Sequence, residues 1–317
     1  MASRKDRKKQ KKKSRTWLKV LVATIVLLGL AGGAYALSIY NDAKQTVQTD
    51  IHKSVKSIET NVTKKKMKEK KPLNILLLGV DERENDVGRS DALMVMSLDP
   101  SKDKMQLISI PRDTRTKIVG HGTTDKINHA YAFGGTDMSI QTVENFLNID
   151  LDYYVKINME GLAEMVDAVG GITVNNEIDW YDEGYYKKGY HYKKGELTLN
   201  GAQAMGYVRM RHLDPRGDFG RNERQRKVIQ AIIDKGASVG SVNKISSVLD
   251  VLGNNVKTNM EFSDMKNLFL NYRSTRKDVT SYEMSGHAKT IDGIYYLIIP
   301  DEEVMKVHNM VKDMNEK

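Results

Sequence analysis

The stretch that decides the fold runs from Leu73 to Arg112 and reads LNILLLGVDERENDVGRSDALMVMSLDPSKDKMQLISIPR. It contains three short apolar runs, Leu73–Val80, Ala92–Leu98 and Met105–Ile110, and the turn Asp99-Pro100-Ser101 closes the second of them. Runs of this length that are rich in Leu, Ile and Val and end at turn residues are typical of buried strands. Because the connections are short, we expect an up-down-up antiparallel meander.

The meander would bring three charged residues to one edge of the sheet. The first strand ends at Asp81, the second begins just after Asp91, and the third ends just before Arg112. Two carboxylates beside an arginine favour a hard cation such as Mg²⁺, which proteins commonly hold with one or two carboxylates plus phosphate oxygens. The alternative is that each aspartate only caps a strand end or a turn.

Further strands and helices alternate downstream of the meander. Apolar spacing predicts helices over Thr136–Leu147, Met159–Val169 and Gly220–Gly236 and near 241–253 and 261–272, and strands over Tyr153–Ile157, Ile172–Asn175 and Thr280–Glu283. Strands interleaved with helices indicate an α/β or α+β sandwich in which helices cover a mixed sheet.

A membrane segment is predicted upstream of this domain. Val20–Ile39 contains twenty consecutive residues without a charge, and a helix of that length spans the roughly 30 Å of a bilayer core. Trp17 and Tyr40 flank the run, as interfacial aromatic residues do, and the basic residues before it favour the cytoplasm. We therefore expect a basic cytoplasmic tail over 1–19 and a transmembrane signal-anchor over 20–40.

A cleaved secretory signal is the alternative for this segment, because Ala34-Tyr35-Ala36 resembles a cleavage site. Both interpretations place the rest of the chain outside the cell membrane. Beyond the segment, Val47, Ile51, Val55, Ile58 and Val62 recur at helical spacing. We expect an extracytoplasmic stalk or linker over 41–71, ending in a solvated lysine run at 64–71 that could also touch an anionic surface, and a catalytic domain over 72–317.

The charge distribution argues against a nucleic-acid partner. The formal net charge is +9, but residues 1–15 carry +8, residues 16–63 carry +1 and residues 64–71 carry +5, which leaves −5 for 72–317. An acidic folded part gives no electrostatic reason to bind nucleic acid. The chain has no cysteine, which excludes disulfide scaffolds, thiol nucleophiles and thiolate zinc sites.

The richest chemistry lies between Tyr207 and Lys227, where seven Lys and Arg residues stand against Asp214, Asp218 and Glu223. If 207–211 is extended, Tyr207, Arg209 and Arg211 share one face, and Val208 and Met210 share the other. If a helix begins near Gly220, then Arg221 and Gln225 fall on the stripe of Val228 and Ile232, with Arg224 beside it, whereas Glu223, Arg226 and Lys227 fall on the opposite side.

Arginines that point the same way as core residues need an anionic partner, because an unpaired buried charge is costly. Guanidinium forks and a helix N-terminus both suit phosphate. The alternative is internal pairing with the three acids, but seven basic residues leave a surplus. Walker A, Gly-x-Ser-x-Gly, His-Glu-x-x-His and Gly-x-Gly-x-x-Gly motifs are absent. His121, His129, His191 and His212 share no ligand spacing, so we interpret them as non-metal residues.

With these motifs the chain resembles the LytR-CpsA-Psr family over residues 72–270. The matching motifs, in chain order, are Leu-Leu-Leu-Gly-Val-Asp81, Arg89-Ser-Asp91, Ile110-Pro-Arg112-Asp113-Thr, Lys126-Ile-Asn128-His-Ala-Tyr, Val208-Arg209-Met-Arg211 and Gly220-Arg221-x-x-Arg224-Gln225. The resemblance implies a three-layer α/β/α sandwich with a central mixed sheet, preceded by one N-terminal transmembrane helix.

The resemblance also implies the roles of the site residues. Asp81 and Asp91 would hold Mg²⁺ or Mn²⁺. The donor diphosphate would contact Arg112, Lys126, Arg209, Arg211, Arg221, Arg224 and Gln225. Arg112, Arg209, Arg211 and Asp218 would be catalytic, and Asp113 and Asp218 are both candidates for the base that deprotonates the acceptor hydroxyl.

The function implied by the resemblance is that of a phosphotransferase on the outer face of a cell membrane, anchored by a single type II span. It would move an undecaprenyl-diphosphate-linked anionic glycopolymer, typically wall teichoic acid, onto peptidoglycan muramic acid through a phosphodiester bond. The lipid tail would need an apolar tunnel lined by helices. Two alternatives stay open: a capsular or other secondary polysaccharide as the cargo, or a non-catalytic sensor or scaffold that binds polyprenyl pyrophosphate.

Overall fold

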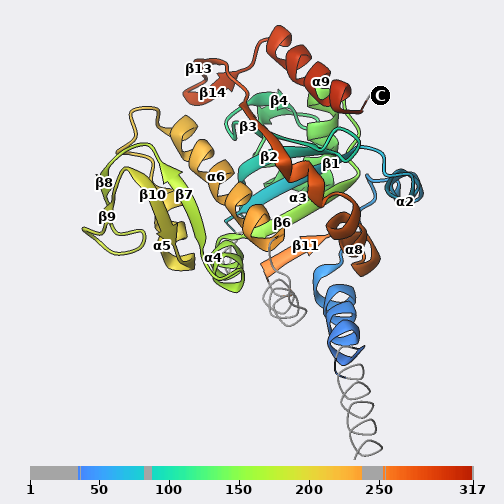
Figure 1. Cartoon of the computed structure of the whole chain (residues 1–317). Helices are drawn as coiled ribbons and strands as arrows, with labels where there is room; N and C mark the ends of the chain where they lie inside the picture. The colour runs from blue at the N-terminus through green and yellow to red at the C-terminus, as the bar shows by residue number, and fades with distance from the viewer. Residues whose placement is uncertain (1–34, 36, 82–87, 238–252, 254, 316–317) are drawn as a thin grey trace, which may run out of the picture.

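The computed structural model describes residues 35, 37–81, 88–237, 253 and 255–315, and a six-stranded sheet of order β11-β6-β1-β2-β3-β12 lies at its centre (Figure 1). The strands are β1 (Leu73–Val80), β2 (Ser90–Asp99), β3 (Lys104–Ile110), β6 (Tyr153–Asn158), β11 (Val256–Thr258) and β12 (Asp278–Glu283). The first three form the predicted antiparallel meander. Because β6 runs parallel to β1 and β12 runs parallel to β3, the sheet is mixed, as predicted.

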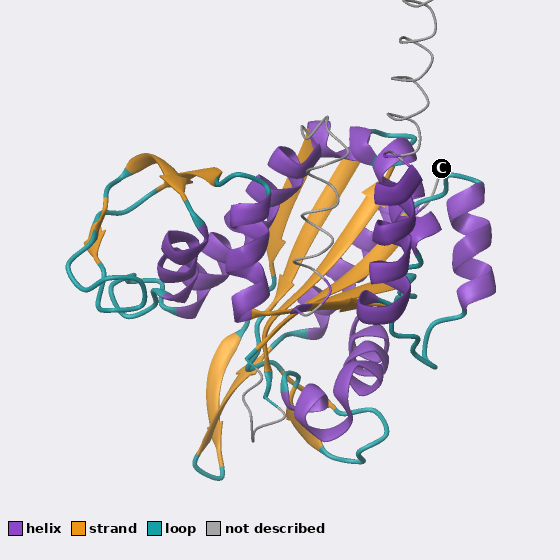
Figure 2. Cartoon of the chain, turned by 90° about the horizontal axis from the view of Figure 1, so that it is seen from below, coloured by secondary structure: helices purple, strands orange, loops and turns teal. Residues whose placement is uncertain are grey.

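Helices cover both faces of this sheet, so the three-layer prediction is confirmed (Figure 2). Alternate residues of β1 explain the two layers, since Leu76 and Leu78 pack on one face and Ile75 and Leu77 on the other. The first face carries α3 (His129–Leu147) and α9 (Asp301–Asn315). The second carries α2 (Thr60–Lys68), α6 (Asp218–Ala237) and α8 (Phe262–Asn271).

A smaller lobe packs against the outer side of α6 (Figure 1). It consists of α4 (Met159–Ala168), β7 (Ile172–Asn176), β8 (Trp180–Tyr181), β9 (His191–Tyr192), β10 (Gly195–Leu199) and α5 (Gly201–Arg209). Its own apolar core includes Val228 and Ile232 of α6. Helix α6 is therefore buried on two sides, by the sheet and by this lobe.

The interpretation of 207–211 as extended is wrong for its first half. Helix α5 continues to Arg209, so Tyr207 and Val208 are both buried although extended backbone would have put them on opposite faces. A capping box starts this helix, in which the Asn200 side chain accepts from Gln203 N and the Gln203 side chain accepts from Asn200 N. The Asn-x-x-Gln pattern of this capping box can be recognised in the sequence and marks the start of the helix.

Two hairpins flank the end of the sheet where β3 finishes. One consists of β4 (Arg115–Lys117) and β5 (Thr124–Lys126), and the other of β13 (His287–Ile291) and β14 (Ile294–Ile298). Leu297 N donates to Asp113 O (2.9 Å), which ties β14 to the chain just after β3. The short helical turns η1 (Val47–Ile51) and η2 (Arg273–Lys277) are the remaining labelled elements, and residues 37–46 before η1 are also helical.

The segment predicted to be a stalk instead packs on the domain. Val47, Ile51, Ile58 and Met67 are buried, and Ile58 belongs to the core on the α3 face of the sheet. Tyr154 donates to Lys53 O (2.8 Å). The lysine run is not a solvated linker either, because it forms most of α2 and Lys66 pairs with buried Asp152 at 2.8 Å. The apolar stripe was real, but its partner is the domain itself.

Other predicted elements agree in position. Helix α3 begins earlier than the predicted Thr136 and breaks at Gly134-Gly135, and its part after the break matches the prediction. The predicted helix near 241–253 and most of the predicted membrane segment at 20–40 lie outside the described residues. Within the residues that are described, none of the helices has the length and apolarity that a membrane crossing requires.

Candidate active site

The three strand ends of the meander meet as predicted. Val80 pairs with Ser90 and Gly79 pairs with Ala92, so Asp91 is an extra residue that has no partner in β1. A bulge of this kind redirects a side chain, and bulges are common beside active sites. Asp81 follows directly, with its backbone N–H donating to Arg89 O (3.3 Å). Both carboxylates therefore belong to the same edge of the sheet.

Arg112 extends this edge from the end of β3. Its Nη1 donates to Asp91 Oδ1 at 2.6 Å, and its Nη2 lies 3.8 Å from Asp218 Oδ2. Arg112 thus joins the sheet edge to the first residue of α6. Burial disfavours the charged guanidinium, but the hydrogen bond to Asp91 and the neighbouring carboxylates outweigh it and raise the pKa of Arg112.

Three guanidinium groups converge on Asp218. Besides Arg112, Arg211 Nε lies 2.9 Å and Arg221 Nη2 lies 3.1 Å from Asp218 Oδ1. The arginines come from the end of β3, from the residues after α5 and from the first turn of α6. Two carboxylates, Asp218 and Asp91, face these three guanidinium groups, so one positive charge is left over, which suits an anion with several negative oxygens.

Arg221 is the least compensated of the three. Its side chain is only 12% exposed, and its Nε makes no hydrogen bond among the described residues. Its Nη2 lies 3.1 Å from Asp218 Oδ1 as an ion pair but makes no hydrogen bond there either. Burial lowers the pKa of Arg221, and the charge of Asp218 only partly offsets this effect. Buried donors without partners are rare in folded proteins and call for an explanation. A phosphate group bound beside the first turn of α6 supplies one.

Lys126 lies close to this cluster. Its Nζ pairs with Asp113 Oδ1 at 2.7 Å, and Asp113 Oδ2 lies 3.8 Å from Arg112 Nε. Hairpin β4–β5 positions it, because Ile127 N donates to Thr114 O (2.8 Å) and holds the end of the hairpin against the chain after β3. The structure therefore brings Lys126 and Asp113 next to Arg112.

The remaining predicted ligands lie less directly at the cluster. Arg209 is exposed in the last turn of α5 and takes part in none of the ion pairs just described. Arg224 is buried, and its Nη1 donates to Asp214 (2.6 Å) and its Nη2 to Met210 O (2.5 Å). Its guanidinium also stacks on Trp180, with 5.6 Å from Cζ to the ring centroid. Arg224 therefore holds the 210–214 segment against α6, a role that sequence reasoning missed.

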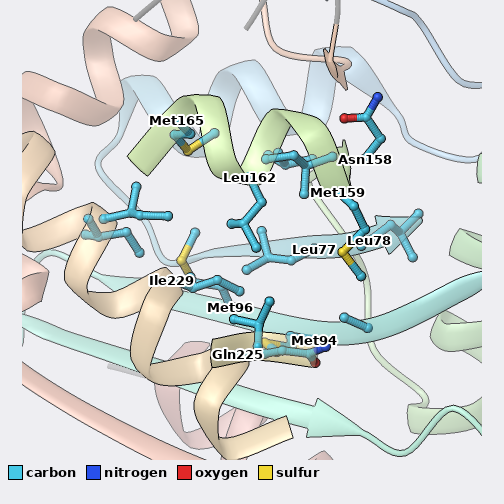
Figure 3. A pocket seen from close by; sticks show the side chains of 17 residues that line it. Leu77, Leu78, Met94, Met96, Asn158, Met159, Leu162, Met165, Gln225 and Ile229 are labelled. Carbon is cyan, nitrogen blue, oxygen red and sulfur yellow. The ribbon is translucent and has the colours of Figure 1, made fainter. Parts of the chain in front are cut away.

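Gln225 connects the cluster to an apolar cavity of about 210 Å³ between the sheet and helices α4 and α6 (Figure 3). Figure 3 shows side chains from three sources around it: Leu77, Leu78, Met94 and Met96 from β1 and β2, Met159, Leu162 and Met165 from α4, and Gln225 and Ile229 from α6. Gln225 is buried one turn beyond Arg221, and its Oε1 has no hydrogen-bond partner among the described residues. The cavity has the apolar lining expected of the predicted tunnel, but strands β1 and β2 form part of its wall as well as helices.

A divalent cation fits this site only with help from a phosphate. Among the described residues there is no group of three His, Cys, Asp or Glu side chains that could hold a metal ion. Asp81 and Asp91 supply two hard oxygen donors at one edge, and one oxygen of Asp91 is already bound by Arg112. This donor set suits Mg²⁺, which commonly takes one or two protein carboxylates and completes its shell with phosphate oxygens and water.

The chain also matches known proteins over most of its length. The model of the LytR_cpsA_psr family matches residues 34–313. The polyisoprenyl-teichoic acid–peptidoglycan teichoic acid transferase TagU of Bacillus subtilis (strain 168) is 44% identical over 312 residues, which is 98% of this chain and all of TagU.

Two solved structures are also similar. The crystal structure of B. subtilis TagU superposes with a TM-score of 0.64 at 43% identity and covers 78% of this chain and 98% of that one. A structure of TagT bound to LIIa-WTA superposes with a TM-score of 0.69 at 32% identity and covers 78% of this chain and 91% of that one.

Proposed function

The chain belongs to the LytR_cpsA_psr family, and from this premise we propose that it transfers teichoic acid from a polyprenyl-diphosphate-linked donor onto peptidoglycan. The observation that carries the proposal is the arginine cluster around Asp218, in which the buried Nε of Arg221 makes no hydrogen bond among the described residues and lies one turn from an apolar cavity. A cationic cluster beside an apolar cavity fits a ligand in which a charged headgroup is joined to a long apolar tail.

The residues have separable roles in this proposal. Arg112, Arg211 and Arg221 bind the diphosphate, while Asp218 keeps their guanidinium groups together. Gln225 lies where the diphosphate gives way to the lipid, which packs among the side chains of α4 and α6. Arg209 is an exposed contact for the outer phosphate or the polymer. Arg224 acts on the site indirectly, by fixing the loop that carries Arg211.

The reaction is a displacement at phosphorus. The acceptor hydroxyl oxygen forms a bond to the phosphorus that carries the polymer, and the bond from that phosphorus to the bridging oxygen breaks. Polyprenyl monophosphate leaves with the bridging oxygen, and the product is a phosphodiester. The arginines neutralise the negative charge on the leaving group and on the oxygens around phosphorus, which is the main task in phosphoryl transfer.

The proton of the acceptor hydroxyl needs a carboxylate. Asp218 is surrounded by three guanidinium groups, whereas Asp113 has two cations nearby, Lys126 at 2.7 Å and Arg112 at 3.8 Å. Asp113 therefore has fewer neighbouring cations than Asp218 and is the better candidate for the general base. Mg²⁺ or Mn²⁺ at Asp81 and Asp91 would, when bound, polarise the phosphoryl oxygens and help to orient the diphosphate. We place the protein in the cell membrane as a single-pass type II protein with this domain on the outer face.

Alanine substitutions in the cluster test the proposal. With the full chain, a lipid-linked teichoic acid precursor and peptidoglycan, Arg211→Ala and Arg221→Ala should each lower transfer by about 10²-fold or more, as loss of one charge-stabilising donor does. Arg276→Ala is the matched control, because Arg276 is a partly exposed arginine that lies 3.9 Å from Asp234. Full activity of both cluster variants would remove these residues from the site.

The same assay separates the other candidate functions. If the wild-type chain transfers only a capsular precursor, the chemistry stands and the cargo is different. If it binds the lipid-linked precursor and releases no polyprenyl phosphate with any acceptor, the chain is a binding protein and the transferase proposal fails.

A further inference from the structure

Helix α8 presents apolar and basic side chains to solvent on one side. Phe269 is 38% exposed and Leu270 is 57% exposed, and Lys266, one turn earlier, is exposed as well. At 100° per residue these three side chains share one side of the helix with Phe262. Asp264, the single acid in the sequence of α8, is buried on the other side. We call Phe262, Lys266, Phe269 and Leu270 the outer face of α8.

The chain that follows the predicted membrane segment runs directly past this face, and Figure 1 shows the helical residues 37–46 next to α8. Tyr40, the aromatic residue expected at the membrane interface, packs edge-on against Phe262 with 5.2 Å between the ring centroids. The Nζ of Lys266 lies 5.7 Å from the centroid of the Tyr40 ring. Because tyrosines at the ends of membrane helices lie at the level of the lipid headgroups, the start of α8 belongs at that level too.

Apolar packing holds this arrangement in place. Ala43, Val47 and Ile51 are buried together, and Phe262 and Met265 of α8 pack against them. These contacts lie between Tyr40 and the body of the domain, so the predicted membrane helix is not joined to the domain by a loose tether. The side of the domain that faces the bilayer is therefore set by packing.

A second observation concerns the apolar cavity. Gln225 lines the cavity near the arginine cluster, and Ile232 and Ile233 line it two turns further along α6. Ile233 also packs on the same apolar cluster as Met265 and Leu268 of α8. The end of the cavity that is remote from the diphosphate site therefore lies towards α8.

The lipid tail of the proposed donor has to pass through that end. A cavity of about 210 Å³ holds only part of an undecaprenyl tail. The remainder must stay in the bilayer while the diphosphate lies at the arginine cluster. The contacts of Tyr40 and the direction of the cavity thus indicate the same side of the domain as the side that faces the membrane.

We propose that the outer face of α8 rests on the membrane surface, with Phe269 and Leu270 among the lipid headgroups and Lys266 beside their phosphates. Apolar side chains flanked by lysine are typical of helices that lie in the membrane interface, and anionic lipids attract the lysine. This inference rests on the proposed membrane anchor and deepens the proposed function, because it places the remote end of the cavity over the bilayer that contains the donor.

The absence of cysteine allows a single-site test in the full chain. Leu270→Cys is labelled with an environment-sensitive fluorophore, and the labelled protein is reconstituted into vesicles of phosphatidylcholine and phosphatidylglycerol. The emission of this label should shift to shorter wavelength than in detergent-free buffer, and phosphatidylcholine with a nitroxide on its headgroup should quench most of it. Tyr181→Cys is the matched control, because Tyr181 is 62% exposed but lies on β8 in the smaller lobe. Its label should stay solvent-like and unquenched.

The readout contains no transfer step, so it is separate from the test of the proposed function. A label at Leu270 that is quenched no more than the label at Tyr181 would overturn the proposal, whether both are quenched or neither is. A chain that does not incorporate into vesicles would overturn it together with the membrane anchor. If Leu270 is selectively quenched in a chain that transfers no polymer, the membrane-facing side stands and the transferase proposal fails.

Discussion

Asp214 shows how a single carboxylate supports the site without being part of it. Its side chain is fully buried and accepts hydrogen bonds from Arg216 and Arg224. Burial alone would raise the pKa of Asp214, but these arginines outweigh it and hold the pKa at about 2. Since this value lies below the ordinary 3.8, the stabilisation is present above about pH 4 and is lost as the pH falls towards 2.

We therefore expect the free energy of unfolding to fall by about 2 kcal/mol between pH 4 and pH 2 through this group. Asp214→Asn should remove most of that dependence. It should also cost about 3 kcal/mol at pH 7, because Arg224 is left buried without its partner. The fluorescence of Trp180, whose ring contacts the Arg224 guanidinium, reports the unfolding transition. The measurement uses a chain without residues 1–36, because Trp17 would otherwise contribute to the signal. An acid dependence of Asp214→Asn as steep as in the wild type would contradict this account, and Asp278→Asn serves as an exposed control.

The prediction about the metal is tested at Asp81, one of the two proposed carboxylate ligands. Chelation of divalent ions should abolish transfer, and added Mg²⁺ should restore it, since the phosphate charge is otherwise only partly neutralised. Asp81→Asn should raise the Mg²⁺ concentration needed for half-maximal transfer by about tenfold or more, as loss of a charged ligand does. Asp91 is left intact in this test because its Oδ1 also accepts a hydrogen bond from Arg112. If transfer is unchanged both by chelation and by Asp81→Asn, the reaction does not need the cation. Asp301→Asn, at the start of α9, is the control variant.

The site residues differ in how far the sequence could place them. Asp81, Asp91 and Arg112 were predictable because each follows or precedes a short apolar run, and strands with short connections leave one arrangement for their ends. The structural role of Arg224 was missed, because only the turn between α5 and α6 brings its partners Asp214 and Met210 to the helix.

At the scale of elements, α6 shows why helical spacing was an incomplete guide. The spacing of Arg221, Gln225, Val228 and Ile232 identified one buried side correctly. Arg226 was expected on the outer side, yet it is buried and donates to Ser109 (2.8 Å) and Glu283 (3.1 Å) of the sheet. A helix between two cores buries polar residues that find internal partners, and a one-sided stripe cannot reveal this.

The segment before β1 gives the prediction at this scale. Val47, Ile51, Ile58 and Met67 are almost fully buried against the domain. Each such side chain contributes roughly 1.5–3 kcal/mol, so together they are comparable to the whole stability of a typical domain. A chain that begins at Pro72 should therefore be insoluble or lack cooperative unfolding, whereas one that begins at Leu37 should fold. Circular dichroism and thermal unfolding of the two chains decide the matter, and equal melting temperatures would restore the stalk interpretation.

On the scale of the whole molecule, the polar site and the apolar cavity follow from one architecture. Antiparallel strands bring the acids and Arg112 to one edge, the parallel neighbour β6 leads into α4, and α6 lies across the sheet to meet it. The cavity is the space left between these helices and the sheet (Figure 3). The alternation of strands and helices predicted a sheet covered by helices, and the family resemblance implied three layers. The smaller lobe on the outer side of α6 depends instead on packing between segments distant in the chain.

The predicted N-terminal membrane anchor should affect how the enzyme meets its donor. A donor with a polyprenyl tail stays in the bilayer, so an enzyme tethered beside it meets the donor at a high effective concentration, whereas a free domain must bind from solution. Removing residues 1–36 should therefore lower the rate with vesicle-bound donor by about 10²-fold at low protein concentration. It should leave the rate with a short-chain, water-soluble donor within about twofold, because the removed residues precede the packed segment that begins near Ala43. The two donors are compared with both chains in the same transfer assay. Equal losses with both donors would mean that the removed residues support the fold or the site, and no loss with vesicles would mean that the tether does not concentrate the enzyme on its substrate.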